Sequence, residues 1–184
     1  MTNIANALEI PEGKWTIDPS HSEIGFEVKH AGISKVKGNF KNFESTVVVN
    51  EDNIVEDIKA VVKTESVSTG NADRDGHLTS ADFFDSENFE NMTFVSAGVT
   101  SSEKGLKLHG DLTIKETTLP VEFNIEYGGS AVDPFGNLRA GLEASTIISR
   151  KDFGLTWNAL LEAGGVLVSD KVKIVLDLSF IKEA

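Results

Sequence analysis

The sequence predicts an all-β protein made of eight antiparallel strands, and two observations carry this prediction. Apolar and polar side chains alternate with a period of two along most of the chain, as they do in strands that bury one face. Clusters of Asn, Asp, Gly, Ser and Pro separate the alternating segments and are typical of turns. Uninterrupted apolar runs, which mark buried parallel strands, are absent, so we expect an antiparallel sheet with one side in water. Such strands form either a sandwich or a closed barrel, and the alternation is compatible with both.

The first half of the chain contains one short and three longer alternating segments. The short one, residues 14–18, is interrupted at Asp18–Pro19, because proline lacks the N–H that pairs strands, and we expect a bulge or bend there. Gly32 and Ser34 predict a turn after the second segment. The side chains expected to face inward are Ile24, Phe26, Val28 and His30 in the second segment, Phe43, Ser45, Val47 and Val49 in the third, and Ile58, Ala60, Val62 and Thr64 in the fourth.

The second half continues the pattern with segments at residues 92–99, 106–115, 121–127, 138–149 and 172–180. Turn residues separate most of them, as at Asp133–Asn137. The inward side chains of three of these segments are expected to be Leu106, Leu108, Leu112 and Ile114; Val121, Phe123, Ile125 and Tyr127; and Val172, Ile174, Leu176, Leu178 and Phe180.

Two inserts interrupt the series of strands. The first carries a short helical insert near residues 71–85, where Thr79 or Ser80 is expected to cap the helix. Phe83 and Phe84 cannot both face water at low cost, so they are expected to pack into the end of a barrel, as a plug or as a ligand contact. The second insert has the spacing of one or two helical turns near residues 155–162. Segments of this kind close a barrel end.

Composition excludes several classes of function. The net charge of −12 argues against a nucleic-acid partner and weakens any case for docking on anionic lipid headgroups. The absence of cysteine excludes disulfides, thiolate catalysis and cysteine-ligated metals. Eleven Phe against two Trp and one Tyr favour either a thick core or an apolar cavity.

The 184 residues fit one domain, residues 14–184, preceded by a flexible lead-in, residues 1–13. The lead-in has no basic residue and no apolar run of signal-peptide length, so we expect a cytoplasmic protein, or a periplasmic or secreted one if a leader has been removed. No segment approaches the ~18 consecutive apolar residues of a membrane span.

The polar candidates have structural as well as functional interpretations. His30 shares the phase of the inward residues, which makes it an interior histidine or a contact for a polar group of a ligand. Arg74 and His77 near a helix start could neutralise a pyrophosphate, while Arg74 and Asp75 could instead pair with neighbouring strands and hold the insert. Arg150, at a strand end, has the same two interpretations.

Metal binding and catalysis have little support in the sequence. His109 is out of phase with the neighbouring leucines and is expected to face water. A metal site would need the distant His21, His30 and His77 to converge, and no HxH or HExxH spacing is present. No G-x-S-x-G elbow and no glycine-rich phosphate loop occurs.

Six short motifs, in order, resemble the YceI-like family over roughly residues 14–181. They are Trp15-Thr16-Ile17-Asp18-Pro19-Ser20-His21-Ser22, Phe26-Glu27-Val28-Lys29-His30, Val36-Lys37-Gly38-Asn39-Phe40, Arg74-Asp75-Gly76-His77-Leu78 with Asp82-Phe83-Phe84-Asp85, Gly110-Asp111-Leu112-Thr113-Ile114, and Arg150-Lys151-Asp152-Phe153-Gly154. The resemblance implies an eight-stranded antiparallel lipocalin-like barrel that holds a long isoprenoid chain, such as a polyprenyl pyrophosphate or the tail of a quinone. Many members of that family are exported.

The resulting hypothesis is binding and sequestration or transport of an isoprenoid lipid, with no catalytic cofactor and with a homodimer possible. The expected ligand-binding residues are Phe26, Val28, His30, Phe40, Phe43, Arg74, His77, Phe83, Phe84, Leu108, Leu112, Phe123, Ile125, Leu176 and Leu178. One alternative is a lipid-directed hydrolase or isomerase that uses His30 or His77 as a base. Another is a stress-response protein that acts through a protein partner, which requires an exposed apolar patch.

Overall fold

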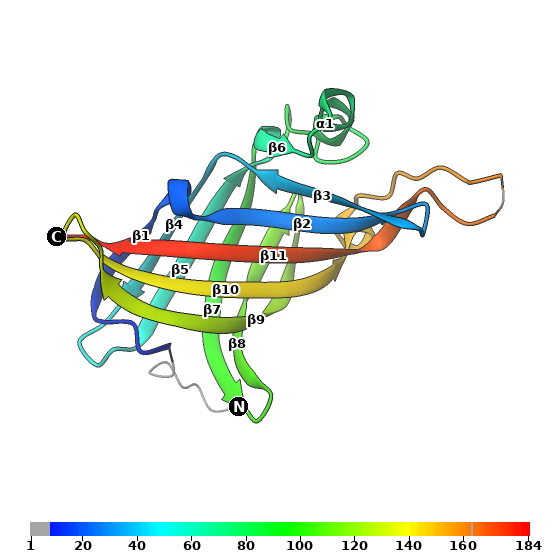
Figure 1. Ribbon diagram of the computed structural model, residues 1–184. Coiled ribbons are helices and arrows are strands. Elements are labelled where there is room, and N and C mark those ends of the chain that lie inside the picture. Colours follow the sequence, from blue (N-terminus) through cyan, green and yellow to red (C-terminus); the bar gives the residue numbers. More distant parts are fainter. Residues whose placement is uncertain (1–7, 163) are drawn as a thin grey trace.

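The computed structural model describes residues 8–162 and 164–184, and it consists mainly of strands that wrap around a central axis (Figure 1). The strands are β1 (Gly13–Ile17), β2 (Glu23–His30), β3 (Ser34–Phe40), β4 (Phe43–Val49), β5 (Val55–Lys63), β6 (Val67–Ser68), β7 (Asn91–Ser102), β8 (Gly105–Ile114), β9 (Thr117–Val132), β10 (Leu138–Ser149) and β11 (Val168–Lys182). The helical elements are α1 (Ala72–Thr79) and the 3₁₀ turns η2 (Pro19–His21), η3 (Thr64–Ser66) and η4 (Arg150–Phe153).

The sheet closes on itself because β1 pairs with β4 on one side and with β11 on the other. Three pairs of short strands act as single interrupted strands: β1 continues into β2, β3 into β4 and β5 into β6. For example, Ile17 of β1 lies opposite Phe180, and Glu23 of β2 lies opposite Asp177, so both pair with β11. Counted in this way the sheet is a closed antiparallel barrel of eight strands, which confirms the predicted fold class and excludes the sandwich.

The interruption predicted at Asp18–Pro19 is present as the 3₁₀ turn η2, whose cap is Asp18. The proline therefore falls in the short bend between β1 and β2, where no ladder hydrogen bond is lost.

Strand β3 was missed because a glycine interrupts its inward positions, Val36, Gly38 and Phe40. A Cβ at Gly38 would lie 2.5 Å from Cζ of Phe26. The Phe26 ring on β2 thus lies over the glycine of the neighbouring strand. Only glycine permits that contact, which removes the alternation from the sequence.

The barrel has two different ends. The terminal end holds residues 8–12, the turns at residues 50–54 and 133–137, and the C-terminus. The insert end holds the two inserts, residues 69–90 and 150–167 (Figure 1). Every strand runs between these two ends, so the barrel interior connects them.

The helix of the first insert lies earlier than predicted. It covers Ala72–Thr79, and its N-cap is Asn71, whose Oδ1 accepts a hydrogen bond from the Arg74 N–H at 3.0 Å. Ser80 stands at the C-terminal end of the helix, where its Oγ donates to the His77 carbonyl. The predicted cap at Thr79 or Ser80 was therefore wrong, since Asn71 is the stronger local acceptor.

No described residue of the second insert is α-helical, so the helical turns predicted near residues 155–162 were wrong. The carbonyls of Leu155 and Trp157 accept hydrogen bonds from Nη1 of Arg150, and the amide of Asn158 pairs with the backbone of Val168. Leu160 is 88% exposed, so the apolar spacing does not reflect a buried helix face. In the part of the chain that the structure describes, no helix is both long and apolar enough to cross a bilayer.

Candidate functional site

The interior of the barrel contains a cavity of about 220 Å³ with an almost wholly apolar wall. Its polar lining, within the described residues, is limited to Ser45, Thr93 and Arg150. Of the residues predicted to bind ligand, those that line it are Phe26, Val28, Phe40, Phe83, Phe84, Leu108, Leu112, Phe123, Ile125, Leu176 and Leu178. The inward phase derived from the alternation therefore places most of these residues correctly.

The cavity exists because small residues occupy some inward positions. Ala60 and Ala144 line the wall among much larger neighbours. Gly110 has no room for a side chain, since a Cβ there would lie 2.6 Å from Cε2 of Phe94, whose ring covers it. The Phe94 ring thus occupies the space that a side chain at position 110 would need.

Four predicted site residues lie outside the cavity wall, and these predictions are corrected. Phe43 is buried at 6% exposure, but it packs within the core. His30 is exposed, at the end of β2 opposite Val168, where a bulge on β11 shifts the register and the barrel wall ends. Arg74 and His77 belong to the first insert and do not line the cavity.

Arg74 and Asp75 hold the first insert together, but through Thr69 before the helix and not through the neighbouring strands that the structural alternative supposed. Arg74 donates from Nε to Oγ1 of Thr69 at 2.8 Å and from Nη2 to the Thr69 carbonyl at 2.9 Å. Asp75 Oδ1 accepts from the N–H and from the hydroxyl of the same threonine. Their polar groups thus fix the turn before α1.

His109 is another correction, because its side chain is only 22% exposed. Its Nε2 lies 2.8 Å from Oγ1 of Thr100, and Nδ1 lies 3.5 Å from Glu122. These partners on the adjacent strands shield the ring, although it faces away from the lumen. No group of three or more His, Asp or Glu side chains among the described residues is placed to hold a metal ion.

Aromatic rings from the two inserts meet and cover the insert end of the cavity. The His77 ring lies 4.6 Å from that of Trp157 and 5.1 Å from that of Phe83, and Phe83 lies 5.6 Å from Trp157. His77 Nε2 is also 2.9 Å from Asp82, which fixes the imidazole. We call His77, Phe83 and Trp157 the aromatic cap. The expectation that the inserts close a barrel end is confirmed.

The terminal end of the cavity is closed by the beginning of the chain. Leu8 and Ile10 line the cavity and are only 1% and 4% exposed. Trp15 is fully buried beside them, and its indole N–H donates to the Pro11 carbonyl at 3.0 Å. The part of the predicted flexible lead-in from residue 8 onward is therefore packed, while residues 1–7 lie outside the described residues.

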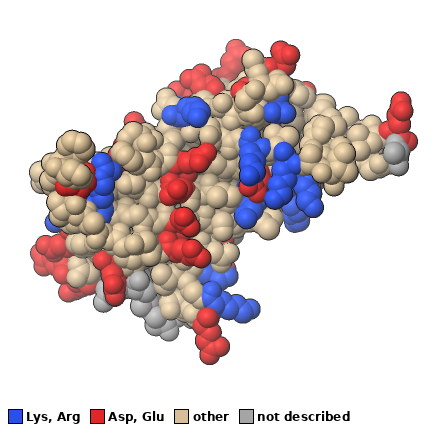
Figure 2. All heavy atoms as spheres, in the orientation of Figure 1, with Lys and Arg blue, Asp and Glu red and all other residues tan. Residues whose placement is uncertain are grey.

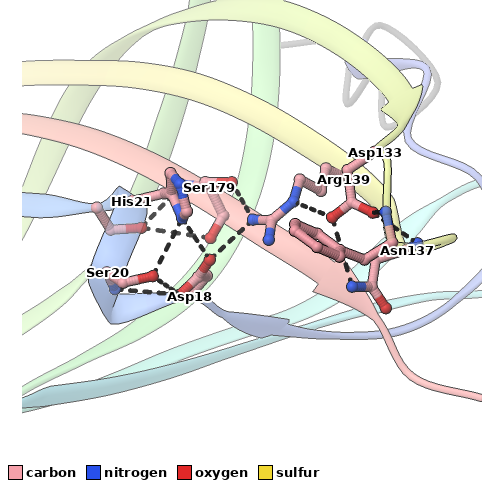
Figure 3. A network of polar contacts seen from close by, with 9 residues as sticks. Asp18, Ser20, His21, Asp133, Asn137, Arg139 and Ser179 are labelled. Atoms are coloured by element: carbon pink, nitrogen blue, oxygen red, sulfur yellow. Dashed lines mark hydrogen bonds and ion pairs between the residues drawn. The ribbon is translucent and has the colours of Figure 1, made fainter.

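A polar network, absent from our sequence-based candidates, ties the terminal end together (Figure 3). Arg139 donates from Nη1 to Asp18 at 2.8 Å and from Nε to Asp133 at 2.6 Å. Asp18 also accepts from Ser20 and lies 2.8 Å from Nδ1 of His21. We call Asp18, Asp133 and Arg139 the clamp, because it joins the η2 bend to the β9–β10 turn.

Electrostatics explain why the clamp is structural. The hydrogen bond from Arg139 is the main reason that the pKa of Asp18 lies far below its usual range and that the pKa of Asp133 falls to about 2. Both carboxylates are thus ionised and fully occupied as acceptors at neutral pH. A carboxylate in this state is a poor proton carrier. In the sequence, only the turn residues around Asp133 and the Asp18–Pro19 break pointed to the positions of the clamp.

Arg150 is the one charged residue among the described residues that line the cavity. It is 4% exposed, and it donates to the carbonyls of Leu155, Trp157, Val168 and Ser169. Burial lowers its pKa, but a guanidinium stays protonated in proteins. Asp170 bonds instead to the Ser149 hydroxyl and the Lys151 N–H, so carbonyl dipoles surround the charge of Arg150.

Comparison with known proteins agrees with this architecture. The family model described as "YceI-like domain" matches residues 15–180. A UPF0312 protein of Staphylococcus aureus (strain MSSA476) is 35% identical over 169 residues, covering 90% of this chain and 96% of that protein. The crystal structure of Burkholderia cenocepacia BcnA superposes with a TM-score of 0.75 at 19% identity, over 89% of this chain and 98% of that one. A polyisoprenoid-binding domain from Saccharophagus degradans superposes with a TM-score of 0.64 at 13% identity, over 92% and 98%. The protein therefore belongs to the YceI-like family.

Proposed function

We propose that this protein binds a long isoprenoid lipid, such as a polyprenyl pyrophosphate or an isoprenoid quinone, and sequesters or transports it. The observation that carries the proposal is the closed apolar cavity within an eight-stranded barrel. A barrel of this size has room for one slender ligand. Burial of hydrocarbon contributes about 25 cal/mol per Å², so a prenyl tail needs no polar contact for affinity. The fold shared with a polyisoprenoid-binding domain supports the same ligand class.

The cavity also suggests an orientation for the lipid. The terminal end offers only apolar groups, from Leu8, Ile10 and Ile17. The charge of Arg150 lies toward the insert end, where η4 begins. A phosphate or a quinone carbonyl beside Arg150 would contact the charge, and the tail directed to the terminal end would contact the apolar side chains. Arg150 is thus the proposed polar contact, in place of Arg74 and His77.

The cavity gives no support to the lipid-directed hydrolase or isomerase. That alternative needed His30 or His77 as a base facing the lumen, and neither residue lines it. His77 is stacked in the aromatic cap beside Asp82.

Organic extraction of the purified protein, followed by mass spectrometry, tests the proposal directly. We expect a prenyl lipid in the extract, or uptake of an added polyprenyl phosphate or quinone by emptied protein. A matched pair of variants locates the ligand. Ala144→Trp fills the lumen, whereas Glu143→Trp adds the same ring on the outer face of the same strand.

We expect Ala144→Trp to lower lipid uptake at least tenfold and Glu143→Trp to retain it. Overpacking costs about 1–3 kcal/mol of stability, so circular dichroism should show both variants folded. An empty extract combined with no uptake by the natural sequence contradicts the proposal, and so does equal uptake by the two variants.

A further inference from the structure

Exposed apolar side chains gather at the insert end on two neighbouring segments. The second insert projects from the barrel as an arm, residues 156–162 and 164–167, drawn in orange in Figure 1. Leu160 and Val166 of the arm are 88% and 43% exposed, and Ile33 in the adjacent β2–β3 turn is 90% exposed. The Ala31 N–H donates to the Leu167 carbonyl at 2.7 Å, so the turn and the arm lie side by side.

The arm is held in place by specific hydrogen bonds. Leu160 and Val166 form a bridge, and the Leu161 N–H donates to the Gly165 carbonyl at 3.1 Å. At the base, Asn158 exchanges hydrogen bonds with the backbone of Val168. Exposed apolar side chains on a hydrogen-bonded base favour contact with a partner.

A cluster of lysines lies next to the arm on the outer face of β2, β3 and β11. We call it the basic face, and Figure 2 shows it as the blue group beside the projecting arm. Its members are Lys29, Lys35, Lys37, Lys171 and Lys173. Lys29 lies directly opposite Lys35 in the register, a like-charge pair that disfavours the sheet.

The basic face has little internal neutralisation. Glu27 is the carboxylate in its midst, 3.6 Å from Lys37 and 3.9 Å from Lys35. The acidic groups of this side of the barrel lie nearer its middle instead, where Glu23, Asp177, Glu143 and Glu126 are consecutive register partners. Figure 2 shows this red band beside the blue group. The charge is thus separated along the barrel, with the positive part toward the insert end.

We propose that the insert end docks on a membrane surface that contains anionic lipid. Leu160 and Val166 of the arm and Ile33 of the β2–β3 turn enter the interface, and the basic face binds lipid phosphates. This arrangement brings the aromatic cap to the bilayer, where a lipid could pass between membrane and cavity. The biological role of docking therefore rests on the proposed function. The docking itself needs no lipid in the cavity. The basic face and the exposed apolar side chains beside it match the phosphates and the hydrocarbon of an anionic bilayer, and a second copy of the chain is the alternative that the test addresses.

Glu162 refines the proposal, because it is the only charged residue of the arm. A carboxylate near the tip repels anionic headgroups, so docking should be weak and sensitive to salt. We therefore expect Glu162→Gln to strengthen it.

Cosedimentation of the full chain with large phosphatidylcholine vesicles, with or without about one third phosphatidylglycerol, tests docking. We expect binding to the anionic vesicles at low salt, and loss of it in 0.5 M NaCl. Leu160→Asp and the pair Lys29→Glu with Lys35→Glu should each lower binding at least fivefold. Glu162→Gln should raise it.

The terminal end supplies matched controls. Phe135 is 87% exposed in the β9–β10 turn, so Phe135→Asp tests whether any exposed apolar residue suffices. Lys14→Glu with Lys104→Glu makes the same charge change away from the insert end. We expect both controls to bind as the natural sequence does.

Three results overturn the proposal. The first is no binding of the natural sequence to anionic vesicles at low salt. The second is an equal loss of vesicle binding in Phe135→Asp and Leu160→Asp. The third is a dimer in gel filtration that Leu160→Asp dissociates, in a protein that never binds vesicles. Ala144→Trp separates the two proposals, because a protein with a filled lumen should still dock. Failure of lipid uptake therefore leaves the docking result interpretable.

Discussion

The two tryptophans of the chain lie at opposite ends of the barrel, and their surroundings differ. Trp15 is fully buried at the terminal end, and its N–H is bonded to the Pro11 carbonyl. Trp157 is half-buried at the insert end, where it contacts the rings of His77 and Phe83. The first belongs to a paired strand of the barrel, and the second to a loop.

This difference indicates that the terminal end contributes more to the stability of the barrel, and that the insert end gives access to the cavity. At the terminal end, strand pairing, the packed residues 8–10 and the clamp would all have to break before the cavity opens. At the insert end, contacts between side chains of two inserts cover the cavity, with no strand pairing between them. Segments with few paired backbone groups open at lower free energy than strands of the barrel. We therefore expect a lipid to enter and leave past the aromatic cap.

The largest expected effect is on global stability at the terminal end. Trp15→Ala removes a fully buried ring and leaves the Pro11 carbonyl without its donor, so we expect a loss of about 3–5 kcal/mol. Trp157→Ala should cost only about 1–2 kcal/mol, since part of that ring is already in water. Urea unfolding followed by circular dichroism measures both. Equal losses would remove the distinction between the two ends.

Acid should weaken the clamp at the terminal end. The pKa values of Asp18 and Asp133 lie below their ordinary value of 3.8, so the clamp stabilises the folded state fully above pH 4 and loses this contribution as the pH falls toward 2. Arg139→Leu removes the shared donor. We expect a lower urea midpoint at pH 7 and a flatter decline below pH 4.

Lys107→Leu is the control for the clamp, because it breaks an exterior ion pair with Glu122. Its urea midpoint at pH 7 should change little, since exposed pairs contribute little to stability. An undiminished acid decline in Arg139→Leu would show that other carboxylates govern it.

A smaller change in free energy at the insert end should have a kinetic effect. Trp157→Ala weakens the aromatic cap, and a barrier lowered by about 1.4 kcal/mol corresponds to tenfold faster release. Dilution of protein loaded with a fluorescent prenyl probe into excess unlabelled lipid measures the rate. Trp15→Phe keeps a large ring at the other end and should release the probe at the natural rate. If both variants release it equally fast, the aromatic cap is not the exit.

The smallest effect should follow from the cap of α1. Asn71→Ala removes the acceptor for the Arg74 N–H and should cost about 1 kcal/mol, whereas Asn71→Asp keeps an acceptor and should cost less. Urea unfolding measures the loss, and limited proteolysis should show it as faster cleavage within residues 69–90. Unchanged cleavage in Asn71→Ala would mean that Arg74 and Asp75 hold the insert without the cap.

Much of the barrel wall could be predicted because alternation is a local property. Leu108, Ile125 and Leu176 face the lumen as their phase indicated. His30 has the same phase but is exposed, since the wall ends where β11 bulges. Trp157 and Leu160 have helical spacing, yet Arg150 takes the carbonyls that a helix would use. These failures occur where a distant segment supplies the deciding contact.

The sequence by itself determined most of the strands, most of their inward faces and the position of the η2 break, because each depends on neighbours a few residues apart. Only the tertiary structure decided that the sheet closes, that its lumen stays open beside Ala60 and Ala144, and that Arg139 reaches Asp18 across 121 positions of the chain. The physical reason is that hollowness and charge pairing depend on which side chains face one another across the barrel, and strand register sets that relation.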